Sequence, residues 1–273
     1  MSERDGYAHG VPCFVSGVFP DPAAAVAFYS DLFGWEAEDL MPAEHPGSYL
    51  ACRLRGRDVA AIVSQHGAPA PPRPVWTTLI WVDSVDEAAA NAAQAGGTVV
   101  GEPFDSPGGG RQAVLADPAG AVFSVWEPRE RRGAQLVNEP GAWSMSALNS
   151  PDPEGAKRFY GGLFGWGTET FDMGGAEMTM WTVPGYVGGE PEQPVPRDVV
   201  ATMIPPGAAG DAPPHWSVDF WVADVDAACA RVADRGGEIH AGPYDIPNTG
   251  LRQAVVADPL GASLSLTQPP GVA

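Results

Sequence analysis

Positive charge is scarce in this sequence. It has 15 Lys and Arg residues against 34 Asp and Glu residues, a formal net charge of −19, and its one lysine is Lys157. A surface this acidic repels the phosphate backbone of nucleic acids. We therefore expect no nucleic-acid partner.

Cysteine is also scarce, and long apolar runs are missing. The three cysteines, Cys13, Cys52 and Cys229, form no CxxC motif and are odd in number, so neither a metal site nor a disulfide framework is indicated. No run approaches the about 18 apolar residues of a membrane-spanning helix, and the first residues lack the basic and apolar regions of a signal peptide. We expect a cytoplasmic monomer or homodimer with no membrane partner.

What the sequence does contain is a long internal repeat. The segment FYSDLFGW (28–35) returns as FYGGLFGW (159–166), and WVDSVDEAAANAAQAGG (81–97) returns as WVADVDAACARVADRGG (221–237). Near each end, RQAVLADPAGA (111–121) returns as RQAVVADPLGA (252–262). The order of the segments is kept, which indicates a duplication. We expect two domains, 8–130 and 140–270.

Each half carries signals for two helices and for several strands. Asp21-Pro22 and Asp152-Pro153 predict helix starts, and Gly34 and Gly165 predict the ends of those helices. A second helix is predicted from Ser84 in one half and from Asp224 in the other. Short β-type runs such as CFVSGVF, WTTLIWV and RQAVLAD lie between and after the helices. The pattern predicts an α+β protein built from four β-α-β-β-β units, paired so that their sheets curl around a cavity.

This arrangement resembles the vicinal oxygen chelate superfamily, which includes glyoxalase I, bleomycin-resistance proteins and extradiol dioxygenases. The resemblance rests on AFYSDLFGW and RFYGGLFGW, on the strand–helix–Gly-Gly units, and on RQAVxADPxGA in each half. It covers nearly the whole chain and is greatest to tandem-domain actinobacterial members labelled glyoxalase-like or hydroxylase. The resemblance implies two glyoxalase-like domains.

The resemblance also implies positions for a divalent metal, which enzymes of this superfamily hold with His, Glu or Gln ligands. In this sequence the first-strand position falls on Phe14 and Met145, the second-unit position on Thr77 and Ser217, and the final-strand position on Ser124 and Ser265. The fourth lies near 58–65 and 198–204, where only Asp58 and Asp198 are acidic. Phenylalanine and methionine are not ligands for Zn²⁺ or Fe²⁺, and neutral hydroxyls are poor ones. The five histidines, at 9, 45, 66, 215 and 240, form no ligand pair. We expect no metal and no other cofactor.

The face of each sheet that carries these positions is a candidate ligand site, because strand side chains alternate between faces. Aromatic and hydroxyl side chains dominate in the first half, which suits a flat apolar ligand. The alternative is that they only fill the core. The candidate ligand-binding residues are Phe14, Ser16, Thr77, Trp81, Ser124 and Trp126 in the first half, and Met145, Asn149, Ser217, Trp221 and Ser265 in the second.

Asp219 is the candidate catalytic residue. A carboxyl group facing an apolar cavity has a raised pKa and can act as a general acid or base. Two other interpretations stay open: an error of one residue in register places Asp219 in solvent, or it pairs with Arg252.

These observations favour a metal-independent protein that binds a small aromatic or polyketide-like molecule of secondary metabolism. One alternative is an enzyme of the lyase, isomerase, cyclase or glyoxalase type, either metal-free with Asp219 as acid or base, or metal-dependent with atypical ligands. A structural or partner-binding protein is a third possibility, favoured if side chains fill both cavities.

Overall fold

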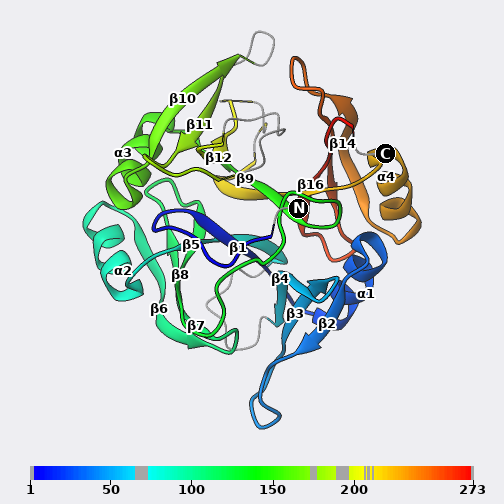
Figure 1. Cartoon of the computed structure of the whole chain (residues 1–273), viewed down its shortest axis with the longest axis horizontal. Helices are drawn as coiled ribbons and strands as arrows, with labels where there is room; N and C mark the ends of the chain where they lie inside the picture. The colour runs from blue at the N-terminus through cyan, green and yellow to red at the C-terminus, as the bar shows by residue number, and fades with distance from the viewer. Residues whose placement is uncertain are drawn as a thin grey trace.

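The computed structural model describes residues 3–64, 73–172, 177–188, 197–205, 207, 210 and 212–271. Within them, two eight-stranded sheets and four helices are arranged as two similar halves (Figure 1). None of the helices in these ranges is long and apolar enough to cross a membrane.

The first half forms one sheet and two helices. In chain order its elements are β1 (Pro12–Phe19), α1 (Pro22–Phe33), β2 (Glu36–Asp39), β3 (Tyr49–Leu54), β4 (Arg57–Ser64), β5 (Val75–Trp81), α2 (Val85–Gln94), β6 (Thr98–Ser106), β7 (Gly110–Ala116) and β8 (Val122–Pro128).

The second half repeats this order. Its elements are β9 (Trp143–Asn149), α3 (Pro153–Phe164), β10 (Gly167–Asp172), β11 (Glu177–Thr182), β12 (Val199–Met203), β13 (His215–Trp221), α4 (Val225–Asp234), β14 (Glu238–Asp245), β15 (Arg252–Ala257) and β16 (Ser263–Gln268).

Each sheet joins two β-α-β-β-β units through their first strands. The strand order is β2-β3-β4-β1-β5-β8-β7-β6 in the first half and β10-β11-β12-β9-β13-β16-β15-β14 in the second. In each half the two central strands, β1 with β5 and β9 with β13, are antiparallel. The predicted α+β class with four such units is confirmed. The domain limits 8–130 and 140–270 remain a prediction.

The helix limits follow the predicted local signals. The Asp21 side chain accepts a hydrogen bond from the backbone N–H of Ala24, and Gly34 ends α1 in the left-handed conformation. Asp152 and Gly165 repeat both features in α3. Ser84 and Asp224 cap α2 and α4 in the same way. These caps explain why all four helices start where the sequence predicts.

Strands β2 and β10 were not among the predicted β-type runs. Every residue of β2 is exposed, and its sequence EAED has no alternation of apolar and polar residues. It pairs only with β3, at the edge of the sheet.

The two sheets pack back to back, and the helices pair across the halves. The Thr78 hydroxyl of β5 donates to the Ser146 hydroxyl of β9 over 2.7 Å, in the buried layer between the sheets. Helix α1 contacts α4 of the other half, and α2 contacts α3. Figure 1 shows these two helix pairs on opposite sides of the molecule. Each unit therefore packs against a unit of the other half as well as pairing with its own neighbour.

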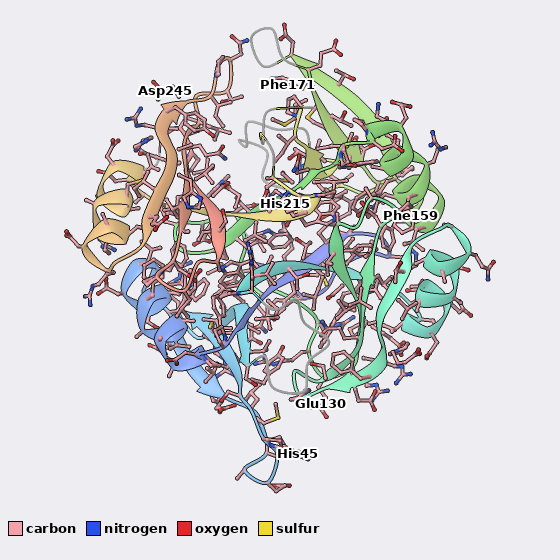
Figure 2. The ribbon with its side chains drawn as sticks, turned by 180° about the vertical axis from the view of Figure 1, so that it is seen from behind. His45, Glu130, Phe159, Phe171, His215 and Asp245 are labelled. Atoms are coloured by element: carbon pink, nitrogen blue, oxygen red, sulfur yellow. The ribbon has the colours of Figure 1, made fainter. Side chains whose placement is uncertain are left out.

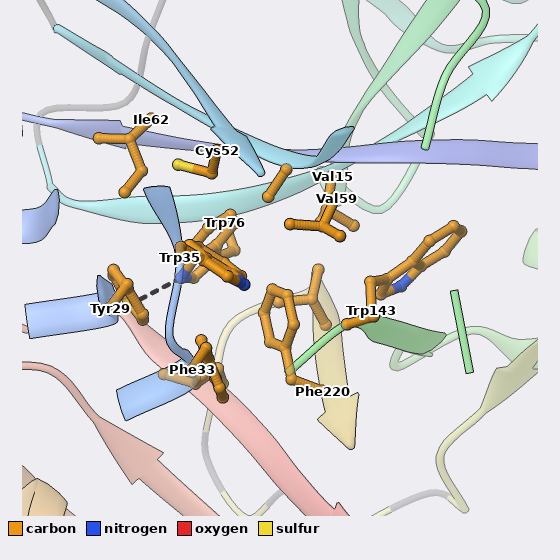
Figure 3. Packing of buried hydrophobic residues seen from close by; sticks show 14 of the residues in the cluster. Val15, Tyr29, Phe33, Trp35, Cys52, Val59, Ile62, Trp76, Trp143 and Phe220 are labelled. Carbon is orange, nitrogen blue, oxygen red and sulfur yellow. Dashed lines mark hydrogen bonds between the residues drawn. The ribbon is translucent and has the colours of Figure 1, made fainter. Parts of the chain in front are cut away.

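Tyrosine side chains of the repeated Phe-Tyr segment connect the halves. The Tyr29 hydroxyl donates to Asp258 Oδ2 over 2.7 Å and accepts from Trp76 Nε1 over 2.8 Å. In the mirror position, the Tyr160 hydroxyl donates to Asp117 over 3.1 Å and accepts from Trp216 Nε1. Figure 3 shows Tyr29 among the aromatic rings of this core, with Phe220 of the other half nearby. The local sequence around Tyr29 and Tyr160 does not indicate these bonds to the other half.

Candidate functional site

The curved face of the first sheet encloses a cavity of about 840 Å³. Residues from seven of its strands line it, one each being Ser16, Tyr49, Val63, Thr77, Gly101, Gln112 and Ser124. This volume lies in the range of sites for drug-sized molecules. The sheet thus curls around a cavity in the first half, as its pattern of paired units predicts.

A row of neutral polar side chains crosses the floor of this cavity. Ser16 of β1 lies opposite Thr77 of β5, and Ser124 follows on β8. Gln112 Nε2 of β7 donates to the Ser124 hydroxyl over 3.1 Å. The Thr77 hydroxyl oxygen is buried and has no hydrogen-bond partner among the described residues. We call Ser16, Thr77, Ser124 and Gln112 the polar row.

Three predicted ligand-binding residues, Phe14, Trp81 and Trp126, do not line the cavity. All three are buried, and the ring of Tyr7, from the N-terminal segment, lies 6.3 Å from the Trp81 ring. Trp126 Nε1 donates to the carbonyl oxygen of Arg131, and the Arg132 guanidinium lies 6.0 Å from the centre of the Trp81 ring. Their rings fill space instead of leaving it open, as the core-filling alternative expects.

The lining of the cavity includes residues of both halves. Tyr49, Ser106 and Pro107 contribute from the first half, and Pro214, His215 and Trp216 from the start of β13. Burial raises the pKa of the Tyr49 hydroxyl to about 12, so this group is uncharged near neutral pH. Figure 2 labels His215 near the middle of the molecule, at the start of β13 in the second sheet. The cavity is therefore a property of both halves together.

The predicted metal positions carry no suitable donor set. Phe14, Thr77 and Ser124 occupy three of them, and the β4 residue opposite Ser16 is Ala61. Asp58 lies at the start of β4, where its carboxylate binds Arg53 over 2.9 Å and Arg131 over 3.1 Å. No group of three His, Cys, Asp or Glu side chains that could hold a metal occurs in the described ranges. The side chains present do not fit a divalent metal centre of the kind the superfamily uses.

The histidines within the described ranges belong to no group that could hold a metal. His9 lies 3.2 Å from Asp83, and His240 lies 3.5 Å from Glu238, both at exposed positions. His66 lies outside the described residues.

The second half carries a polar group two residues further along the strand, at Asp219, which corresponds to Leu79 of the first half. The Ser144 hydroxyl donates to Asp219 Oδ2 and the Thr267 hydroxyl donates to Oδ1, each over 2.6 Å. Gln253 Nε2 donates to Thr267 over 2.9 Å and lies 3.4 Å from Asp219 Oδ1. Burial raises the pKa of the Asp219 carboxyl to about 6, although these donors lower it. The carboxyl is half-buried and lies on the same face as Ser217.

Arg252 does not pair with Asp219. Its guanidinium binds Asp226 over 2.9 Å and Asp245 over 3.1 Å, both at the surface. Asp219 forms no ion pair with any arginine or lysine in the ranges that the structure describes. The alternative of a salt bridge to Arg252 is therefore wrong.

The other candidate residues of the second half are less enclosed than those of the first. Met145, Ser217, Trp221 and Ser265 are all half-buried. Asn149 is 9% exposed, and its Nδ2 donates to the carbonyl oxygens of Ala212 and Pro213. Neither they nor Asp219 line the first-half cavity.

Three polar residues of these faces were not among the predicted site residues. Gln112 and Gln253 occupy equivalent places in the repeated segments RQAVLAD and RQAVVAD, and their sequence context indicated no role in a site. His215 was considered only as a metal ligand, but it lines the cavity. Side chains alternate along each strand, and neighbouring strands share a face. The positions of Ser124 and Thr267 could therefore have indicated that Gln112 and Gln253 lie on the same faces.

Comparisons with known proteins agree with this architecture. The family model described as "Glyoxalase/Bleomycin resistance protein/Dioxygenase superfamily" matches residues 17–125 and again 144–266. "Putative glyoxylase CFP32" of Mycobacterium tuberculosis is 35% identical over 98% of each chain. "Anthracycline biosynthesis protein DnrV" of Streptomyces peucetius is 32% identical over 96% of this chain and 94% of the relative.

A solved structure with the same fold is the Mn(II)-bound glyoxalase from Novosphingobium aromaticivorans. It superposes with a TM-score of 0.61 at 19% identity, over 95% of this chain and 82% of that one. At this identity the likeness describes the fold alone.

Proposed function

Because the chain belongs to the Glyoxalase/Bleomycin resistance protein/Dioxygenase superfamily, we propose that it binds an uncharged, flat aromatic or polyketide-like molecule without a metal. The ligand lies in the first-half cavity, with its oxygen atoms against the polar row and its rings against the apolar walls. As expected from the sequence, the protein acts in the cytoplasm.

The observation that carries this proposal is the Thr77 hydroxyl. Thr77 is 8% exposed, its oxygen has no described partner, and it lies on the cavity floor. A buried hydroxyl without a hydrogen bond costs free energy, which a ligand oxygen in the cavity recovers. The neighbouring hydroxyls of Ser16 and Ser124 add further donors and acceptors along one line.

The charge of the lining supports an uncharged ligand. Of the described residues that line the cavity, none is a Lys or Arg, and Glu102 is the one that carries a carboxylate. An anionic ligand would find no cation to pair with, and burying an unpaired charge is costly.

The relatives support the aromatic class. One of them is named for the biosynthesis of anthracyclines. The apolar part of the cavity wall includes Phe104, Val63 and Val114, which suit a planar ring system.

Metal independence is supported by the side chains at Phe14, Thr77 and Ser124, none of which replaces an imidazole or carboxylate ligand. Protein purified without a chelator should contain well under one equivalent of transition metal. One equivalent, lost together with ligand binding on dialysis against EDTA, would contradict this part of the proposal.

The binding test uses 2-hydroxyanthraquinone, with anthraquinone-2-sulfonate as its anionic counterpart. The neutral compound should bind and the sulfonate should bind at least tenfold more weakly. Thr77→Val keeps the shape of the side chain and removes its hydroxyl, so binding should weaken about 3–10-fold, the range of one net hydrogen bond. Thr98→Val, at an exposed position of β6, is the matched control and should change nothing. Equal binding of the sulfonate contradicts the proposal.

A second candidate function is a metal-free enzyme that uses Asp219. The observation that favours it is a half-buried carboxyl with a raised pKa and two short hydroxyl contacts on the second-half face. Such a group can exchange a proton near neutral pH. If a substrate is found, Asp219→Asn should abolish turnover while leaving the fold intact. Unchanged turnover removes this candidate.

A further inference from the structure

Among the described residues that line the first-half cavity, His215 has the one basic side chain, and it comes from the second half. We infer that His215 recognises a phenolic hydroxyl of the ligand, accepting its hydrogen bond at Nε2. This inference rests on the proposed function and narrows the ligand class from neutral aromatic molecules to phenols.

The hydrogen bonds of the ring fix which nitrogen is available. His215 Nδ1 lies 2.7 Å from the carbonyl oxygen of Pro213. A carbonyl oxygen has no proton to donate, so Nδ1 must carry the hydrogen of this bond. In the neutral ring the lone pair then lies on Nε2, which can only accept.

The buried Asn149 side chain binds the backbone of residues 212–213, which in turn orients the His215 ring. Asn149 Nδ2 donates to the carbonyl oxygens of Ala212 and Pro213, each over 3.3 Å, and also lies 3.5 Å from His215 Nδ1. Asn149 is 9% exposed and sits at the end of β9, opposite His215. It is a positioning residue, because it orients the backbone carbonyl that orients the imidazole.

No residue of the described part of the chain forms a hydrogen bond with His215 Nε2. The other titratable groups among the described lining residues are Tyr49 and Glu102. The Tyr49 hydroxyl is uncharged near neutral pH, and the Glu102 side chain is exposed. Neither group is a neutral nitrogen base like the His215 imidazole. The free acceptor therefore has room for a donor from the ligand, and a phenol is a stronger donor than an alcohol.

The repeat shows that this imidazole is not required by the fold. The segment VWTTLIW of β5 corresponds to HWSVDFW of β13, so Val75 stands where the second half has His215. Both residues line the cavity. The equivalent strands β5 and β13 therefore start with an apolar valine in the first half and with a hydrogen-bond acceptor, His215, in the second.

The experiment compares 2-hydroxyanthraquinone with 2-methoxyanthraquinone, which has the same rings and no donor. Binding is measured by tryptophan quenching below the pKa of the free phenol. Wild-type protein should prefer the hydroxyl compound about tenfold. His215→Phe keeps a ring and should remove the preference by weakening only the hydroxyl compound, and Asn149→Ala should reduce it in part. His215→Gln retains an acceptor and should restore part of it.

His240→Phe is the matched control, since His240 is exposed and lies outside the cavity, and it should keep the wild-type preference. The inference is overturned if wild type binds both compounds equally, or if the preference survives in His215→Phe. Failure of wild type to bind either compound instead removes the proposed function, and this inference with it.

Discussion

Removing the hydroxyl of Tyr29 tests whether the two halves stabilise each other. Tyr29 is fully buried, and its hydroxyl is both the donor to Asp258 and the acceptor for Trp76 Nε1. Tyr29→Phe keeps the ring and its packing, including the ring contact with Trp35 at 5.8 Å. The substitution therefore changes hydrogen bonding across the halves and little else.

The expected loss follows from the two bonds. The 2.7 Å bond to the Asp258 carboxyl is of the stronger, charge-assisted kind. Its loss also leaves Trp76 Nε1 buried without an acceptor, since Trp76 is 2% exposed. A bond to a charged group contributes about 1.5–3 kcal/mol and an orphaned buried donor costs about 1–3 kcal/mol, and the two overlap in part. We expect Tyr29→Phe to lower the free energy of unfolding by about 2–4 kcal/mol.

The assay is urea unfolding followed by tryptophan fluorescence. Asp258→Asn is the second arm of a double-mutant cycle, because its side-chain oxygen can still accept from the backbone N–H groups of Leu260 and Ala262. Tyr160→Phe should cost a similar amount, because Tyr160 repeats the arrangement. Tyr244→Phe, at a 40% exposed position, is the control and should cost under about 0.5 kcal/mol.

Two results would refute the reasoning. One is a Tyr29→Phe cost no greater than that of Tyr244→Phe. The other is unfolding of wild type in two separate transitions, of which Tyr29→Phe moves only one. Units that pack across the halves should instead unfold together.

Three further outcomes are expected. Because the folded-state pKa of Asp219 is raised from 3.8 to about 6, ionisation of this carboxyl destabilises the fold as pH rises from about 4 to about 6. Asp219→Asn should therefore gain stability relative to wild type across that window, and a pH-independent difference in midpoint would contradict this. Asp21→Ala removes the cap of α1 and should cost about 1 kcal/mol, measured by urea unfolding with Asp152→Ala as its counterpart. EDTA should change neither the melting temperature nor the binding of 2-hydroxyanthraquinone, and a fall in both would show a metal.

Much of the fold could be predicted because its signals are local and occur twice. The aspartates before proline and the glycines after the first helix of each half each act within one turn. Because the same signals occur in both halves, each half supports the helix limits predicted for the other. The edge strand β2 gave no such signal, since its exposed EAED sequence is held by pairing with β3 and not by burial. The bond from Tyr29 to Asp258 spans 229 positions, and no local pattern indicates it.

The site was predictable only in part, for a similar reason. Strand alternation placed Ser16, Thr77 and Ser124 on one face, and all three line the cavity. Strand alternation could not show that the segment after β8 covers one end of that face. Trp126 was therefore predicted to bind the ligand, as Ser124 was. Nor could it show that His215 lines a cavity formed chiefly by the other half. Both depend on how distant segments meet.

The crossed packing of the units suggests how the two copies came to differ. In a dimer of two identical half-length chains, the bond from Tyr29 to Asp258 and the bond from Tyr160 to Asp117 would be one contact made twice. A substitution in such a dimer changes both faces at once. In the fused chain the shared surface persists while each face varies alone, so Leu79 could remain apolar where Asp219 became acidic. For the same reason, cutting the chain between β8 and β9 should expose the aromatic surface of each half, and the fragments should be recovered as a complex and not as separate domains.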